Sequence, residues 1–306
     1  MPTDSAAAHA ALAPDLAPPP PPAPEPGGGV LIQGERLSFH HRAAAELLPA
    51  AEAVPVASFP ELAARLEADP SQLGLMAIEN SVAGALLTNY LLIEEHGLRI
   101  HGEVYLRVSH HLLAVPGATL AGLRRVESHP MALRQCRRLF RERGHLSPVE
   151  AYDTAGSALR VAGLGDPSLG ALAPIWCADE LGLRVLARAV EDNPHNWTRF
   201  VLVRHGSSPA PAPVPGAATK SSVAFSVAHE SGTLARALTH LAEIGTSLTK
   251  LQSLPAIGSP WEYRFFADYL LPAGQTSEAV LGLLAERTLR LTHLGTYPEG
   301  QHVDPS

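Results

Sequence analysis

One pattern recurs along most of this chain: an apolar strand, a short polar turn and then an amphipathic helix. It is visible in VLIQGERLSFHHRAAAELL and LGLMAIENSVAGALLTNYLLIEEHG, and again in VESHPMALRQCRRLFRERG, VEAYDTAGSALRVAG and ALAPIWCADELG. Strands that alternate with helices pair in parallel and are covered by helices on both faces of their sheet. The helix that begins at Pro130 shows the expected period, with Leu133, Cys136, Leu139 and Phe140 on one face. The pattern predicts an α/β fold.

Segments rich in Pro, Ala and Gly divide the chain of 306 residues into parts. Residues 1–29 have no apolar periodicity, and we predict that they form a disordered tail. The stretch HGSSPAPAPVPGAATKS, residues 205–221, has a similar composition and is predicted to be a linker. Residues 222–297 then show the order strand, helix, strand, strand, helix, strand, which is typical of a ferredoxin-like sandwich. Residues 298–306 are expected to be a tail.

Charge and cysteine content narrow the classes of partner and the compartment. The formal net charge is −7 and no basic tract is present, so nucleic acid and anionic membranes are poor candidate partners. Cys136 and Cys177 form no CxxC motif, which suits a reducing cytosol. No apolar stretch approaches the roughly 20 residues of a membrane-spanning helix, and the N-terminus does not have the pattern of a signal peptide. We therefore expect a cytoplasmic protein.

Common cofactor and metal motifs do not occur in the sequence. The 15 histidines are scattered, without HExxH or zinc-finger spacing, so we predict no metal site. GxGxxG and GxxxxGK[ST] are both missing, which argues against dinucleotide and P-loop binding.

Chemistry is therefore expected at the polar turns, because ligands of open α/β sheets bind beyond the carboxyl ends of the strands. Taken singly, each turn has an ordinary explanation. Asn80 and Ser81 in IENS, Ser128 in SHP and Asp153 or Thr154 in DTA are all favourable helix caps. Gln135 could simply face solvent, and Arg199 could form a surface ion pair.

The stretch EDNPHNWTRFVLV, residues 191–203, is the least ordinary of these turns. It places many hydrogen-bonding side chains directly before a strand that should be buried. The ordinary explanation is a polar loop, with Arg199 in a surface ion pair.

Taken together and in order, ENS, SHPMALRQC, DTA and NPHNWTRFVLV, followed by the βαββαβ module, resemble prephenate dehydratase with a C-terminal ACT regulatory domain. The resemblance runs from about Val30 to about Tyr297. It implies a two-lobed catalytic region, like a periplasmic binding protein, over residues 30–204. Lobe one would be about 30–108 plus 190–204, and lobe two about 109–189. On this reading NPHNWTRF crosses back into lobe one, and its polar side chains line the floor of the cleft.

The resemblance also implies a reaction, the conversion of prephenate to phenylpyruvate with loss of carbon dioxide and water. Formation of the aromatic ring drives this reaction, so no cofactor is expected. By resemblance, Thr198 donates to the departing hydroxyl, Arg199 clamps a carboxylate, and Glu79 or His129 could supply a proton. The implied catalytic set is Thr198, Asn80, Gln135 and Glu79, and the implied substrate-binding set is Arg199, Ser81, Ser128, His129, Thr154 and Asn196.

The C-terminal module is implied to bind L-phenylalanine as an allosteric effector. Its candidate residues are Gly232, Thr233 and Leu234 at a helix start, and Ser247 and Leu248 at the start of a strand. The sequence departs from the family pattern at Ser247, where Asn is common, and at Leu254, where Arg is common. It also departs in the first turn, which leaves the role of Ser38 open. An empty structural module that serves dimerisation is the alternative.

Three further questions stay open at this level. Arogenate, which carries an amine in place of the keto oxygen of prephenate, is an alternative substrate, and a non-catalytic amino-acid sensor of the same fold is an alternative function. A homodimer or a homotetramer is expected, because an isolated four-stranded sheet leaves an edge open. Residues 1–29 are too short and too rich in Pro for a chorismate mutase domain, so a monofunctional enzyme is expected.

Overall fold

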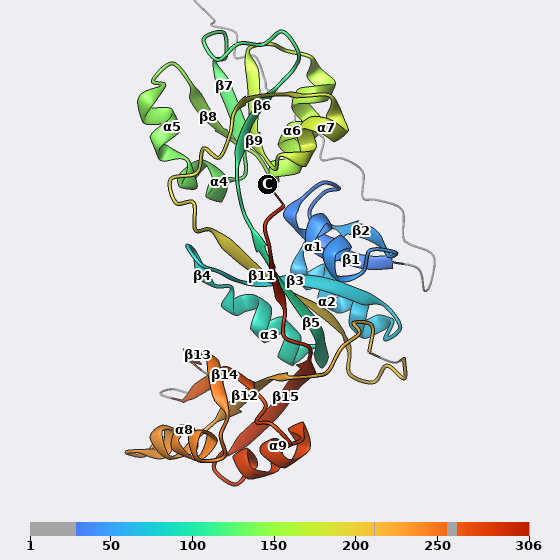
Figure 1. Ribbon diagram of the computed structural model, residues 1–306, viewed down its shortest axis with the longest axis vertical. Coiled ribbons are helices and arrows are strands. Elements are labelled where there is room, and N and C mark those ends of the chain that lie inside the picture. The colour runs from blue at the N-terminus through green and yellow to red at the C-terminus, as the bar shows by residue number, and fades with distance from the viewer. Residues whose placement is uncertain (1–28, 211, 256–261, 306) are drawn as a thin grey trace, which may run out of the picture.

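The structure, a computed structural model, describes residues 29–210, 212–255 and 262–305. The tail predicted over residues 1–29 lies outside that range, except for Gly29, which begins the first strand. The described residues form three sheets arranged along the long axis of the molecule (Figure 1). Lobe two, at the top of that view, and a C-terminal unit, at the bottom, lie on either side of lobe one. The predicted α/β fold with two lobes and a βαββαβ module is confirmed.

Lobe one is built on a seven-stranded sheet in the order β16-β5-β11-β3-β1-β2, with β4 paired to β3. The pairs β1–β2 and β1–β3 are parallel, whereas β11 runs antiparallel to both β3 and β5. The central strands are buried along most of their length because their apolar runs have helices on both sides. The strands are β1 (Gly29–Gln33), β2 (Glu52–Val56), β3 (Leu73–Asn80), β4 (Gly84–Ala85), β5 (Leu98–Arg107), β11 (Trp197–His205) and β16 (Gln301–Val303), and the helices are α1 (Phe39–Leu47), α2 (Phe59–Ala68) and α3 (Leu87–Glu95).

Lobe two has a five-stranded sheet in the order β10-β6-β9-β7-β8. Its strands are β6 (His111–Ala114), β7 (Arg125–Ser128), β8 (Ser147–Glu150), β9 (Leu169–Ala173) and β10 (Arg184–Ala187), and its helices are α4 (Pro130–Gln135), α5 (Arg137–Glu142), α6 (Thr154–Leu164) and α7 (Trp176–Leu181). The continuous helix predicted from Pro130 is wrong in one respect, since it breaks at Cys136 into α4 and α5. The break has a cause in the next chain crossing, because the Asp192 carboxylate accepts from the backbone N–H groups of Arg137 and Arg138 and so caps a new helix.

The C-terminal unit, residues 220–297, has the element order β12 (Lys220–Ser226), α8 (Thr233–Glu243), β13 (Ser247–Pro255), β14 (Tyr263–Leu270), α9 (Ser277–Ala285) and β15 (Arg290–Tyr297). Its antiparallel sheet has the order β13-β14-β12-β15, so β13 and β15 are its edges. Val223, Phe225, Leu241 and Tyr269 lie in the core between this sheet and its helices.

Lobe one and the C-terminal unit share a hydrophobic core. Tyr90 and Ile100 of lobe one lie in the same buried cluster as Phe266 and Leu294 of the C-terminal unit. The approach is close at Gly295, where an added Cβ would lie 2.2 Å from the carbonyl oxygen of Ile100. No side chain fits there, so the position requires glycine.

The chain after the C-terminal unit is not the tail that was predicted for residues 298–306. Residues 301–303 form β16, which pairs in parallel with β5 of lobe one. The His302 ring stacks on the Tyr105 ring with centroids 4.5 Å apart, and Arg107 Nη1 lies 2.7 Å from Asp304 Oδ2. The red end of the chain therefore runs from the C-terminal unit back along lobe one towards lobe two (Figure 1).

We predict that removing residues 301–306 destabilises the protein. The truncation removes a strand pairing, a ring stack and an ion pair, and we expect the melting temperature to fall by on the order of 5 °C. Thermal unfolding followed by circular dichroism measures this. Removal of residues 305–306 alone is the control and should leave the melting temperature unchanged. Equal melting temperatures for the longer truncation and the full chain would show that β16 adds no stability.

Candidate active site

Strand β11 brings together the polar side chains that were predicted to act together. Thr198 lies opposite Asn80 of β3 in the sheet, and Asn80 Nδ2 donates to Thr198 Oγ1 at 2.9 Å. The same Nδ2 donates to Asn196 Oδ1 at 2.7 Å. The side-chain oxygen Asn80 Oδ1 accepts from the backbone N–H groups of Val82 and Ala83, which fixes the orientation of the side-chain amide. Because the Thr198 oxygen accepts from Asn80, its own proton is left to donate.

The network continues into lobe two. Asn196 Nδ2 donates to Gln135 Oε1 at 3.0 Å, and His110 Nε2 lies 3.2 Å from the same oxygen. An amide oxygen only accepts, so the His110 ring carries its proton on Nε2 in this arrangement. Burial lowers the pKa of His110, although the bond to Gln135 and the nearby Glu191 oppose that shift. A neutral imidazole therefore closes one end of the network, and sequence reasoning did not identify this residue.

Glu191 and Asp192, which precede β11 in the sequence, hold the crossing between the lobes in place. The Glu191 carboxylate, which is almost fully buried, accepts from Ser109 Oγ and from the backbone N–H of His110, both at 2.9 Å. Asp192 caps α5, as described above. Only Asn196 and Thr198 of this stretch join the Asn80 network. The polar residues of this stretch thus have two roles. Glu191 and Asp192 fix the crossing between the lobes, and Asn196 and Thr198 belong to the candidate site.

Two predicted substrate-binding hydroxyls are used by the fold itself. Ser81 Oγ donates to the His195 carbonyl at 2.9 Å and accepts from the Trp197 N–H at 2.9 Å. Ser128 Oγ is fully buried and donates to the Leu172 carbonyl at 2.6 Å. Their protons point at backbone oxygens, so both hydroxyls support the site, and their contact with a substrate stays a prediction.

His129 and Thr154 lie at helix starts in lobe two, and neither is hydrogen-bonded to the Asn80 network. His129 Nδ1 accepts from the Met131 N–H at 3.2 Å and caps α4. Thr154 is the first residue of α6, directly after the N-cap Asp153. In lobe one, Ser38 caps α1 by accepting from the His41 N–H. Their roles towards a substrate stay predictions.

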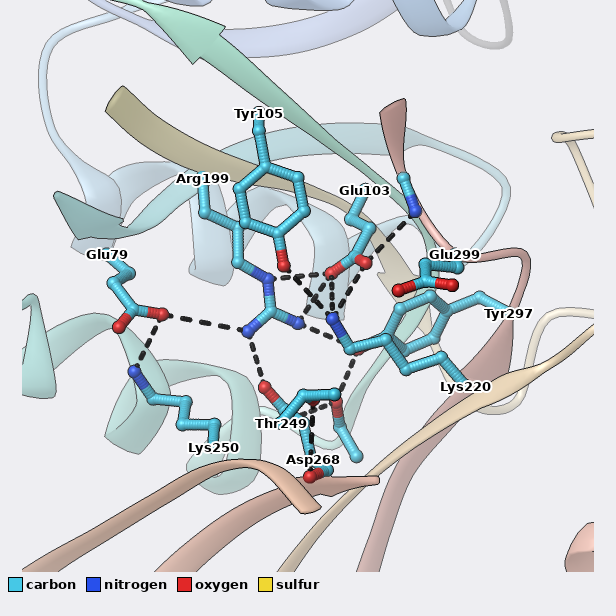
Figure 2. Close-up of polar contacts among 12 residues, drawn as sticks. Glu79, Glu103, Tyr105, Arg199, Lys220, Thr249, Lys250, Asp268, Tyr297 and Glu299 are labelled. Atoms are coloured by element: carbon cyan, nitrogen blue, oxygen red, sulfur yellow. Dashed lines mark hydrogen bonds and ion pairs between the residues drawn. The ribbon is translucent and has the colours of Figure 1, made fainter. Parts of the chain in front are cut away.

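The predicted roles of Arg199 and Glu79 require correction. Adjacent residues of a strand point to opposite faces of the sheet. Arg199 directly follows Thr198, and Glu79 directly precedes Asn80. The Arg199 side chain is 2% exposed and is bound by Glu103, Asp268 and Tyr297 (Figure 2). Glu79 Oε2 lies 2.9 Å from Lys250 Nζ of the C-terminal unit. Both side chains face the C-terminal unit, so neither is placed to clamp a substrate carboxylate or to supply a proton to the Thr198 network.

The predicted effector residues occupy two places in the C-terminal unit. Gly232, Thr233 and Leu234 line a hollow of about 560 Å³ at the start of α8, together with Tyr263 and Phe265. Gly232 has a φ of 82°, and Thr233 Oγ1 donates to the Ala228 carbonyl at 2.6 Å. Ser247 and Leu248 begin the edge strand β13, are exposed, and do not line that hollow.

The chain is similar to known proteins in both sequence and fold. The model of the family described as prephenate dehydratase matches residues 30–208. A bifunctional N-acyl-homoserine lactone acylase/prephenate dehydratase of Komagataeibacter europaeus is 36% identical over 239 residues, 78% of this chain and 84% of that protein. Arogenate dehydratase 2 of Petunia hybrida is 35% identical over 291 residues, 90% of this chain and 72% of that protein. The crystal structure of prephenate dehydratase from Arthrobacter aurescens in complex with L-Phe has a TM-score of 0.76 and 28% identity, and the match covers 88% of this chain and 89% of that one.

Proposed function

The chain belongs to the prephenate dehydratase family, and on that premise we propose that it converts prephenate to phenylpyruvate at the network around Thr198. The observation that carries the proposal is the set of bonds from Thr198 through Asn80 and Asn196 to Gln135, which joins the two lobes at their crossing. The enzyme is a lyase, as the family is.

Thr198 is the residue that acts on the leaving group in this proposal. The ring hydroxyl of prephenate is a poor leaving group and needs a donor aimed at it. Asn80 occupies an acceptor position of the Thr198 oxygen, which leaves the O–H proton to point at the departing oxygen. Threonine is a weak acid, so its part is hydrogen-bond donation within a relay that supplies the proton.

The surroundings of the network suit the loss of the ring carboxylate. Amides form most of it, and the imidazole at its end is neutral. With Arg199 turned away, no guanidinium of β11 neutralises a carboxylate at this place. A poorly neutralised carboxylate is destabilised relative to carbon dioxide, which favours decarboxylation. The pyruvyl carboxylate is then held by hydroxyl and amide donors, for which Thr154 at the start of α6 is our candidate.

Arogenate is the second candidate substrate, because the Petunia hybrida relative is named an arogenate dehydratase. The two substrates differ only in the side chain, where an amine replaces the keto oxygen. The leaving group and the ring carboxylate are the same, so the chemistry assigned to Thr198 applies to both.

We predict that the purified protein forms phenylpyruvate from prephenate, and that the rate with arogenate identifies the preferred substrate. Chromatography of phenylpyruvate and phenylalanine measures both reactions. An N-acyl-homoserine lactone forms a third arm, since one relative's name includes that acylase activity. We expect no hydrolysis there, because the hydroxyls of Ser81, Ser128 and Thr198 are bonded to carbonyl oxygens or an amide and not to a base. The absence of product from both prephenate and arogenate would refute the proposed function.

We predict that Thr198→Ala folds normally and loses most of its turnover, by about 10²–10³-fold, because one positioned donor is lost. Thr198→Ser keeps the hydroxyl and should retain more of the activity. Steady-state kinetics and melting temperatures of these variants provide the test. Thr119→Ala, at an exposed position of lobe two, is the matched control and should behave like the wild type. Wild-type turnover by Thr198→Ala would remove Thr198 from the catalytic set.

The C-terminal unit is, in our proposal, an ACT regulatory domain that binds L-phenylalanine. The hollow at Gly232 supports this, because a positive-φ glycine before α8 lets a ligand approach the backbone and the helix start favours a carboxylate. Tyr263 and Phe265 in the same lining offer an apolar surface to an aromatic side chain. The complex of the Arthrobacter aurescens protein with L-Phe supports the choice of ligand.

Assembly through the edge strand β13 completes this proposal. Leu248 and Leu251 on that strand are 38% and 42% exposed, and the strand's outer edge carries no partner among the described residues. Exposed apolar side chains on an open edge favour pairing with a second copy. We propose a homodimer, or a homotetramer built from such dimers, in which Ser247 and Leu248 of one copy complete the hollow at Gly232 of the other.

We predict that L-phenylalanine binds the wild type better than tyrosine or tryptophan does, and that Gly232→Val abolishes the binding. Valine at a φ of 82° is strained, and its side chain meets Arg236, 3.0 Å from the position of an added Cβ. Titration calorimetry gives the result. Gly274→Val is the matched control, since its φ of 78° imposes a similar strain away from the hollow. The absence of heat from all three amino acids at millimolar concentration would leave the unit with a structural role.

The cytoplasm remains our proposed location. Cys136 and Cys177 are buried as free thiols, which is the form expected in a reducing compartment. Among the described residues, no helix has both the length and the apolar composition needed to cross a bilayer.

A further inference from the structure

Two pairs of oppositely charged residues face each other across the interface between lobe one and the C-terminal unit (Figure 2). Arg199 of β11 and Glu79 of β3 are opposite each other in one sheet. Asp268 of β14 and Lys250 of β13 are opposite each other in the other sheet. The Asp268 carboxylate binds the Arg199 guanidinium, and Lys250 Nζ lies 2.9 Å from Glu79 Oε2. Each cation therefore meets the anion of the other unit.

The neighbouring pair on the same two strands is the proposed catalytic pair, Thr198 and Asn80. Thr198 and Asn80 are also opposite each other in the sheet and are joined by the bond of 2.9 Å. Each is one residue from the charged pair, about 3.8 Å along the backbone, and points to the other face. Any shift of β11 relative to β3 at the charged pair therefore changes the contact between Thr198 and Asn80.

Arg199 is held too completely to adopt a second position easily. Its Nε lies 2.7 Å from Glu103 Oε2, its Nη2 lies 2.6 Å from the same oxygen, and its Nη2 also donates to the Tyr297 hydroxyl at 3.0 Å. Its Nη1 binds Asp268, which is 1% exposed. Burial would raise the pKa of Asp268, but the Arg199 guanidinium and the Ser222 hydroxyl bring that pKa below its usual value. The Asp268 carboxylate is therefore charged, and Asp268 and Glu103 together hold the planar guanidinium at two of its edges.

We propose that Asp268 and Lys250 of the C-terminal unit are positioning residues for the dehydratase reaction, because through Arg199 and Glu79 they set the placement of β11 against β3 on which the Thr198–Asn80 pair depends. This inference rests on the proposed function. It assigns to the C-terminal unit a contribution to basal turnover, in addition to any binding of an effector.

The chain offers a control that separates positioning from simple docking of the two units. Arg264 of β14 binds Glu94 of α3, with Nε 3.1 Å from Glu94 Oε2. This ion pair also crosses the interface and is also largely buried, but Glu94 lies on a helix and makes no contact with the network around Thr198. Glu94→Gln therefore weakens the same interface without touching β11 or β3.

The first experiment compares Asp268→Asn with Glu94→Gln in the full-length protein. We expect kcat of Asp268→Asn to fall about tenfold to a hundredfold, with KM changed less than about threefold, because a small misplacement of a catalytic donor affects the transition state most. Glu94→Gln should keep the wild-type kcat even where its melting temperature falls by a similar amount. Equal effects of the two variants on kcat would overturn the proposal.

Milder variants cover the case in which Asp268→Asn fails to fold. Lys250 and Glu79 lie nearer the surface, with side-chain exposures of 7% and 39%. Lys250→Gln should lower kcat, whereas Lys250→Arg, which keeps the charge, should restore most of it. The double variant Glu79→Gln/Lys250→Gln should be no slower than Glu79→Gln alone, because Glu79→Gln already removes the contact with Lys250, together with the contact of 3.9 Å between Arg199 Nη1 and Glu79 Oε2. A wild-type kcat for Lys250→Gln, or a double variant much slower than Glu79→Gln, would contradict the proposal.

A measurement without substrate separates this inference from the proposed function. Amide hydrogen exchange of residues 197–201 reports the local opening of β11. It should be faster in Lys250→Gln than in the wild type and unchanged in Glu94→Gln. If the wild type turns over neither substrate, the proposed function is wrong. If amide exchange in Lys250→Gln is unchanged, the C-terminal unit does not hold β11 and this inference is wrong.

Discussion

The packing of lobe one against the C-terminal unit depends most on one side chain, Arg199. A guanidinium that is 2% exposed must have every edge paired, and its partners come from β5, β14 and β15, which belong to two different units. Removal of one partner from a buried ion pair costs about 3–5 kcal/mol, because the remaining charge is left without compensation. The C-terminal unit is therefore part of the structure that supports β11. Lys220 and Glu103, 2.9 Å apart beside Arg199, extend the same cluster along the interface.

The alternation of side chains along β11 explains how one strand serves two neighbours. Thr198 belongs to the polar network, Arg199 to the ion cluster and Phe200 to the core of lobe one. Three successive residues therefore contact three different parts of the structure. The crossing that precedes the strand is fixed by Glu191 and Asp192, which bind backbone N–H groups of lobe two. A candidate site at the crossing thus receives its rigidity from both lobes and from the unit behind it.

Much of this could be predicted from the sequence, and the errors have physical causes. The strand and helix pattern predicted an α/β fold followed by a βαββαβ module, whereas the two lobes and the grouping of Asn80, Gln135, Asn196 and Thr198 came from the family resemblance. The error on Arg199 and Glu79 came from treating adjacent strand residues as if they shared a face. The signal for their true partners was present, because Glu103, Lys220 and Asp268 are charges inside apolar strands, which need buried partners. Strand β16 had no such signal, since its three residues are ordered by the edge of β5.

The contacts of Lys250 and Asp268 with Glu79 and Arg199, which link the C-terminal unit to the strands of the candidate site, bear on regulation. Ser247, Leu248 and Lys250 lie on one strand, and in our proposal a ligand or a second copy that contacts the start of β13 acts on Lys250, which holds Glu79. A ligand changes turnover only through a difference in its affinity for two arrangements of the protein. Arg199 is bonded too completely to supply a second arrangement, so in our proposal the two arrangements differ in whether Lys250 holds Glu79. The effector's influence on the reaction is then limited by the free energy of that contact, and its sign depends on which arrangement its site prefers.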